Sequence, residues 1–161
     1  NELLNYSRPV KLERSPVHVK DMVEQAVSLV LERIKKVSLN VELDQPDETI
    51  VVDSMKLVQV LVNLLNNAAD AMPEGGTLSI HSSISGGAFH LFVSDTGQGI
   101  EPENLERIFE PFFTTKTRGT GLGLSICKKI IEAHHGKICI TSTPGKGTTA
   151  EIEVPASPQP A

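Results

Sequence analysis

Two asparagines one helical turn apart are the first residues of this sequence that could do chemistry. Asn63 and Asn67 share their spacing with Gln59 and Asp70, so all four side chains project from one stripe of an expected helix. An amide oxygen is a hard, neutral ligand that suits Mg²⁺, which keeps most of its waters and takes few protein ligands. The same stripe is also typical of a solvated helix face, and this alternative stays open.

A carboxylate stands at the end of an expected strand and is followed by two glycines. The run Asp95-Thr-Gly-Gln-Gly-Ile100 could aim the Asp95 side chain into a pocket, while Gly97 and Gly99 let a flat ring come close. A plain Asp-Gly turn without any ligand is the alternative.

A third candidate is a glycine-rich loop that opens a helix. Gly119-Thr-Gly-Leu-Gly-Leu-Ser125 offers free backbone N–H groups at a helix start, and such groups bind phosphate with the help of the helix dipole. Lys116 and Arg118 lie beside this loop and could meet phosphate charge. The loop lacks the P-loop pattern, and Leu124 stands where a dinucleotide-binding fingerprint has Gly or Ala. A flexible loop with solvated charges is the alternative.

Two further groups of residues have plain structural explanations. Three of the five phenylalanines gather in the loop Phe109-Glu-Pro-Phe-Phe113, where they could border a ligand or pack under the loop. His134 and His135 follow a helix and are expected to form an exposed end.

Composition narrows the class of protein. The chain has 161 residues, and its 15 Lys and Arg against 20 Asp and Glu give a net charge of −5, which argues against a nucleic-acid partner. No apolar run is long enough to span a membrane, and no secretory signal pattern is present. Cys127 and Cys139 lack metal-site spacing, so both are expected to be buried thiols in a reducing compartment. We therefore expect a cytoplasmic domain.

Hydrophobic periodicity predicts the elements that position the candidate residues. Because the expected helices and antiparallel hairpins are segregated along the chain, the fold class is α+β, with helices on one face of an antiparallel sheet. The proline-rich tail, residues 155–161, is expected to be frayed and disordered. Helices are expected over residues 19–36, 54–72 and 120–134, and strands over 39–43, 49–53, 77–84, 88–95, 137–143 and 148–154.

The order of these motifs closely resembles the catalytic ATP-binding domain of sensor histidine kinases of two-component systems. The resemblance covers residues 18–154, and its wider ATPase superfamily includes type II topoisomerases, mismatch-repair proteins and a heat-shock chaperone. The matching segments are that family's N, first glycine, F, second glycine and third glycine boxes, at Asn63–Ala71, Asp95–Ile100, Phe109–Lys116, Gly119–Ser125 and Gly145–Thr148.

The resemblance implies a fold, two cofactors and a set of contacts. The fold would be a two-layer α/β sandwich of the Bergerat type, with a mostly antiparallel mixed sheet and with ATP held between the helices and a short lid over about residues 113–121. Asp95 would accept a hydrogen bond from the adenine amino group, Asn67 would coordinate Mg²⁺ beside Asn63, and Thr148 would lie near the adenine. The remaining expected ATP-binding residues are Asp70, Gly97, Gly99, Ile100, Phe109, Thr115, Lys116, Gly119, Thr120, Gly121, Leu122, Gly123 and Leu124.

The family's phospho-accepting histidine lies in an upstream dimerisation domain, in a His-Glu or His-Asp context. Residues 1–17 look like the tail of that domain and its linker, so we expect the acceptor histidine to belong to the dimerisation domain. The implied partners are that domain and a response regulator, the fragment is expected to be monomeric, and the parent would be a homodimer that could be membrane-anchored. The required context is absent at His18, His81, His90, His134 and His135.

Two other functions of the same superfamily are also compatible with the sequence. One is an ATP-hydrolysing conformational switch, whose N box resembles Glu-x-x-x-Asn. This chain has Asn63 in place of the glutamate, and an amide cannot take a proton from water near neutral pH. The other is an anti-sigma-type regulatory kinase that sequesters a partner, although the second glycine box resembles the sensor-kinase form more closely.

Overall fold

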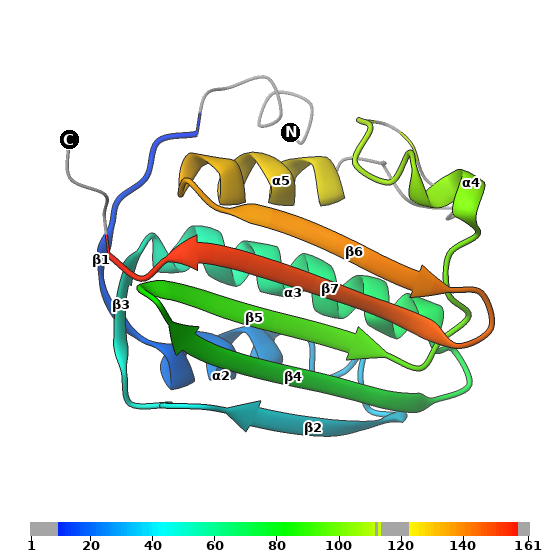
Figure 1. Cartoon of the computed structure of the whole chain (residues 1–161). Coiled ribbons are helices and arrows are strands. Elements are labelled where there is room, and N and C mark those ends of the chain that lie inside the picture. Colours follow the sequence, from blue (N-terminus) through cyan, green and yellow to red (C-terminus); the bar gives the residue numbers. More distant parts are fainter. Residues whose placement is uncertain (1–9, 112, 114–122, 158–161) are drawn as a thin grey trace.

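The fold consists of two layers, a five-stranded sheet and the helices that cover one of its faces (Figure 1). The computed structural model describes residues 10–111, 113 and 123–157. The helices are α2 (Val19–Leu29), α3 (Ser54–Ala71), α4 (Pro102–Leu105) and α5 (Gly123–Ala133). The strands are β1 (Ser15–His18), β2 (Val37–Leu43), β3 (Thr49–Val52), β4 (Gly76–Ser85), β5 (Ala88–Asp95), β6 (Lys137–Thr143) and β7 (Gly147–Pro155).

The sheet is mixed, with one parallel pair. Its strand order is β2-β4-β5-β7-β6, where β2 runs parallel to β4 and the other neighbours are antiparallel. A separate antiparallel pair, β1 with β3, lies at one side. Helices α2, α3 and α5 all lie against the same face of the five-stranded sheet (Figure 1). The expected fold class is confirmed.

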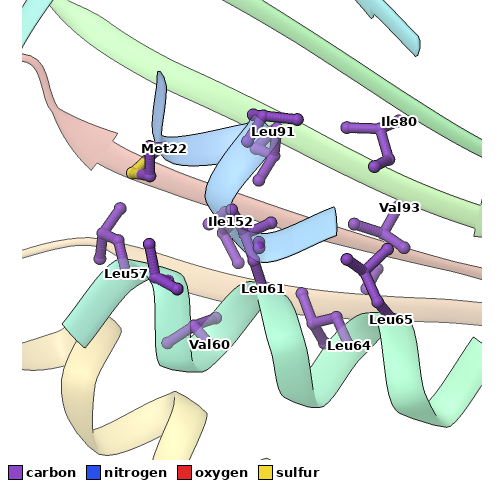
Figure 2. Close-up of a cluster of buried hydrophobic side chains, with 14 of the residues drawn as sticks. Met22, Leu57, Val60, Leu61, Leu64, Leu65, Ile80, Leu91, Val93 and Ile152 are labelled. Carbon is purple, nitrogen blue, oxygen red and sulfur yellow. The ribbon is translucent and has the colours of Figure 1, made fainter. Parts of the chain in front are cut away.

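Helix α3 supplies the centre of the core. Its apolar side chains recur at three- and four-residue steps, which places them on one face of the helix. Figure 2 shows this face directed toward side chains of β4, β5 and β7, including Ile80, Leu91 and Ile152. Full burial of one such side chain stabilises a fold by roughly 1.5–3 kcal/mol, so the core fixes α3 against the sheet. The buried apolar residues of α3 are Leu57, Val58, Val60, Leu61, Leu64, Leu65, Ala68 and Ala69.

Helix α2 is shorter than the periodicity predicted. It ends at Leu29, and the chain continues as turns to residue 36 before β2 begins. Val30 and Ile34 are nevertheless buried, because the turns carry them onto the core, and the Ile34 N–H donates to the Val30 carbonyl over 3.2 Å. The apolar spacing therefore continues past the end of the helix, and that spacing alone could not locate the end.

The two cysteines differ in exposure. Cys127 on α5 is buried, as expected, but Cys139 on β6 is exposed, so the expectation of two buried thiols was wrong. Neighbouring residues of a strand point to opposite faces, and on β6 the buried Ile138 takes the helix-covered face, which leaves Cys139 on the uncovered one. At the open end of the same hairpin, β7 runs to Pro155 and the Ala156 N–H donates to the Gly87 carbonyl over 2.8 Å, so residues 155 and 156 belong to the sheet and not to the expected frayed tail.

Candidate functional site

Asp95 lies at the end of β5 with one of its carboxylate oxygens already bound. Oδ1 accepts hydrogen bonds from the backbone N–H of Gly97 at 2.8 Å and from that of Thr148 at 3.3 Å. Within the described residues, no hydrogen bond reaches Oδ2. Burial raises the pKa of the Asp95 carboxyl above its usual value, and the two N–H groups act in the opposite direction. The carboxylate is thus fixed in orientation and keeps one oxygen for a further donor.

The glycines beside Asp95 are required by packing inside the protein. A Cβ on Gly97 would collide with the carbonyl group of Ala71, the last residue of α3. Gly147 has φ of 130°, and a Cβ there would collide with the Asp95 carbonyl. The Gln98 N–H also donates to the Ala71 carbonyl over 3.1 Å. These contacts bring the end of β5, the end of α3 and the start of β7 together. The sequence predicted that the glycines let a flat ring come close, and it contained no signal of this packing between elements.

Thr148 sits next to Asp95 and is held from its other side. Asp95 and Thr148 are directly paired across β5 and β7, and Thr148 is paired in turn with Ser142 of β6. The hydroxyl oxygens of Ser142 and Thr148 are 2.8 Å apart. The Ile100 N–H donates to Ser142 Oγ over 2.8 Å, so the end of the loop after β5 is fastened to the same serine. Ser142 is a site residue that the sequence reasoning missed.

The polar stripe of α3 faces partly toward α5. Asn63 Nδ2 donates to the Gly123 carbonyl at 3.5 Å and lies 3.6 Å from Cys127 Sγ, both on α5. Because the amide nitrogen is used in this contact, the Asn63 carbonyl oxygen is the atom that could serve a ligand. Asn67 is half-buried one turn further along the helix. The stripe therefore connects the first residue of α5 with the end of α3 that meets the Asp95 loop.

Two other predicted residues have partners in the structure. Asp70 forms an ion pair with Arg33, which lies in the turns after α2. Phe109 packs partly buried against the core, and the Lys128 ammonium lies 5.5 Å from the centre of its ring. Neither the Arg33 contact nor the Lys128 contact had a signal in the sequence, because each joins segments that are far apart in the chain.

The expectation of an exposed histidine pair was half wrong. His134 is 3 % exposed, whereas His135 lies at the surface. The His134 ring contacts Asp53, the N-cap of α3, whose Oδ1 accepts from the Lys56 N–H at 3.1 Å. The other oxygen of Asp53 accepts from the Glu13 N–H at 2.9 Å. The segment before β1 is therefore fastened to the start of α3.

The structure brings together one group of the predicted residues and leaves another undescribed. Asp95, Gly97, Gly99, Ile100 and Thr148 converge around the end of β5, with Asn63 and Asn67 on the adjoining helix. Gly123 and Leu124 begin α5. The remaining predictions lie outside the described residues: Thr115, Lys116, Arg118, Gly119, Thr120, Gly121 and Leu122.

Comparison with known proteins identifies the protein family to which the chain belongs. The family described as histidine kinase-, DNA gyrase B-, and HSP90-like ATPase matches residues 52–158, and the chain belongs to this family of ATP-binding ATPase domains. The chain is similar to sensor histidine kinase ZraS of Salmonella typhimurium, with 37 % identity over 158 residues that cover 96 % of this chain and 34 % of that protein. It is also similar to sporulation kinase B of Bacillus subtilis, with 33 % identity covering 95 % of this chain and 36 % of that protein.

Solved structures give the same relationship. The nucleotide-free catalytic domain of histidine kinase ThkA is 37 % identical with a TM-score of 0.83, covering 91 % of this chain and 97 % of that one. Full-length ShkA in complex with AMPPNP is 30 % identical with a TM-score of 0.86, covering 100 % of this chain and 36 % of that one. ThkA in complex with the response regulator TrrA is 35 % identical with a TM-score of 0.82, covering 96 % and 45 %.

The resemblance to the catalytic domain of sensor histidine kinases is therefore confirmed, and the domain is homologous to those kinases. The chain spans about a third of the length of the curated relatives it matches. No helix within the described ranges is long and apolar enough to cross a bilayer.

Proposed function

We propose that this chain binds Mg²⁺·ATP and transfers the γ-phosphoryl group to a histidine on a separate dimerisation domain. The observation that supports this best is the carboxylate of Asp95, whose Oδ1 is held by two backbone N–H groups while Oδ2 stays available. Adenine carries an exocyclic amino group that can donate to such an oxygen. The kinase names of the homologous proteins supply the reaction class.

The polar stripe of α3 fits a Mg²⁺ ion of the kind found with nucleotides. The described residues contain no cluster of three or more His, Cys, Asp or Glu side chains suited to a metal. An ion that keeps most of its waters and takes an amide oxygen and phosphate oxygens needs no such cluster. Asn67 would hold the ion, with Asn63 beside it, and the ion would offset charge on the phosphates during transfer. Lys116 and Arg118 remain predicted phosphate contacts.

The nucleophile comes from outside the chain. A neutral imidazole nitrogen has a lone pair and needs little activation. His134 could not serve, because it is buried with both ring nitrogens in hydrogen bonds. The partners we propose are the kinase's own dimerisation domain and then an aspartate of a response regulator. The parent would be a homodimer whose catalytic domain works in the cytoplasm, with or without a membrane anchor elsewhere.

Nucleotide selectivity tests the adenine contact. Guanine has a carbonyl where adenine has its amino group, so two acceptors would face each other in a partly buried site, which costs roughly 1–3 kcal/mol. We expect ATP to bind at least about tenfold more tightly than GTP, and Asp95→Asn to reduce this preference because an amide can donate. Calorimetric titration measures both, with Asp44→Asn at an exposed carboxylate as control. Equal affinities for ATP and GTP in the unmodified chain would contradict the assignment.

Labelling with radioactive ATP tests the transfer. The chain alone should acquire no stable acid-labile phosphate. Addition of a dimerisation-domain fragment of the same kinase should give label on the fragment only. Stable label on this chain would contradict an external acceptor.

A further inference from the structure

Ser142 of β6 lies at the centre of three polar contacts around the proposed adenine site. Its Oγ accepts a hydrogen bond from the Ile100 N–H at 2.8 Å. It lies 3.0 Å from the Gly147 carbonyl oxygen and 2.8 Å from Thr148 Oγ1. These neighbours come from the loop after β5 and from the start of β7. No direct contact between Ser142 and Asp95 is present, and of the three neighbours of Ser142 it is Thr148 that pairs directly with Asp95 across β5 and β7.

The number of protons fixes the direction of these hydrogen bonds. A serine hydroxyl has one proton to donate and two lone pairs that accept. The Ile100 N–H can only donate and the Gly147 carbonyl can only accept. All three contacts are satisfied together only when Ser142 donates to Gly147 and accepts from both Ile100 and Thr148. The Thr148 hydroxyl proton then points toward Ser142.

This direction matters because Thr148 is the cross-strand neighbour of Asp95. Directly paired residues on one face of a sheet have adjacent side chains. A Thr148 hydroxyl that did not donate to Ser142 could turn its proton toward the ligand side and present a donor beside the Asp95 carboxylate. With the proton held by Ser142, Asp95 and Thr148 both present lone pairs at this end of the site.

We propose that Ser142 is a positioning residue that leaves only hydrogen-bond acceptors, from Asp95 and Thr148, at this end of the site. The site would thereby bind a purine base with an exocyclic amino group more tightly than a purine base without one. The inference rests on the proposed adenine contact of Asp95. The selectivity for the amino group would then depend also on Ser142 of β6, because Ser142 fixes the direction of the Thr148 hydroxyl proton.

The experiment compares ATP with purine riboside 5′-triphosphate, which lacks the amino group, by calorimetric titration. Loss of one oriented acceptor should reduce the preference for ATP by about three- to tenfold in Ser142→Ala. Ser142→Thr retains the hydroxyl and should retain the preference. Thr141→Ala, at the exposed neighbouring position, should change nothing. Ser142→Cys keeps the side-chain volume with a poor hydrogen-bonding group, so it gives a second measurement if the alanine variant does not fold.

A double-mutant cycle separates positioning from general stability. Thr148→Val should itself reduce the preference, and adding Ser142→Ala to it should reduce it no further, since Ser142 acts through Thr148. An unchanged preference in Ser142→Ala and Ser142→Cys, or additive effects in the cycle, would overturn the role of Ser142. Absence of any preference in the unmodified chain would instead overturn the adenine contact of Asp95.

Discussion

The His134 ring accepts a hydrogen bond from the backbone N–H of Asp53 at 3.1 Å, across 81 residues of sequence. The other ring nitrogen, Nδ1, lies 2.9 Å from the Ile130 carbonyl. A carbonyl can only accept, so Nδ1 carries the proton and Nε2 is the acceptor, which is the neutral form of the ring. The contact joins the end of α5 to the start of α3, and thus fixes the two helices that border the proposed nucleotide site.

Stability should therefore fall in mild acid. Burial lowers the pKa of His134 below its usual 6.5, with Arg14 and His135 adding to the shift, while the Ile130 hydrogen bond and Asp53 oppose it. The unfolded chain then binds the proton more readily than the folded one, so the free energy of unfolding is highest above pH 6.5 and declines as the pH falls toward the lowered pKa. Urea unfolding at a series of pH values measures this decline. His134→Gln should remove this component of the decline, and His135→Asn, at an exposed neighbour with positive φ, should keep it.

Gly97 and Gly123 should respond in opposite ways to alanine. A methyl group at Gly97 would collide with Ala71, so Gly97→Ala should destabilise the domain by about 1–3 kcal/mol. A Cβ at Gly123, the first residue of α5, would meet no atom of the described residues within 4 Å. Gly123→Ala should therefore be neutral or stabilise the domain by up to about 1 kcal/mol. Thermal unfolding of both variants checks the pair, and a Gly97→Ala variant as stable as the unmodified domain would show that the loop does not pack on α3 as described.

The two thiols should differ sharply in reactivity. Burial raises the pKa of Cys127 to about 12, whereas Cys139 is exposed. The thiolate is the reactive form, so iodoacetamide at neutral pH should modify Cys139 first and leave Cys127 unmodified until the domain unfolds. Peptide mass spectrometry with and without urea follows both sites, and Cys139→Ser should leave the folded protein unlabelled.

Binding of the metal ion should depend on Asn67, whereas binding of the adenine base should not. Asn67→Ala should weaken binding of Mg²⁺·ATP far more than binding of adenosine, because the lost amide is expected to touch the ion. Gln59→Ala, exposed on the same stripe two turns earlier, is the matched control and should affect neither ligand. Equal losses for Mg²⁺·ATP and adenosine in Asn67→Ala would remove Asn67 from the metal site.

Periodicity predicted the fold well where one face of an element is buried. The stripe of α3 and the alternation of β4, β5 and β7 place Leu61, Ile80 and Ile152 in the core, as the local pattern requires. The pattern failed where burial depends on distant segments. His134 is buried because the end of α5 meets Asp53, and nothing near His134 in the sequence reports that contact.

Sequence motifs name the candidate site residues, but they do not explain why some of those residues are needed. The position of Asp95 at the end of a strand was readable from the alternation before it. The need for glycine at residue 97 comes from Ala71, and the hold on Thr148 comes from Ser142, so both depend on how separate elements pack. Spacing within one motif carries no information about such packing.

The attachment of Glu13 to Asp53 also has a mechanical consequence. Asp53 anchors the incoming chain with Oδ2 and the first turn of α3 with Oδ1, and Arg14 reaches the Ala133 carbonyl at the end of α5 over 3.4 Å. Tension or torque applied to the chain ahead of Glu13 would load these two helices directly, without first crossing the five-stranded sheet. Force on the segment that enters the domain would therefore be transmitted to α3, the helix that carries Asn63 and Asn67.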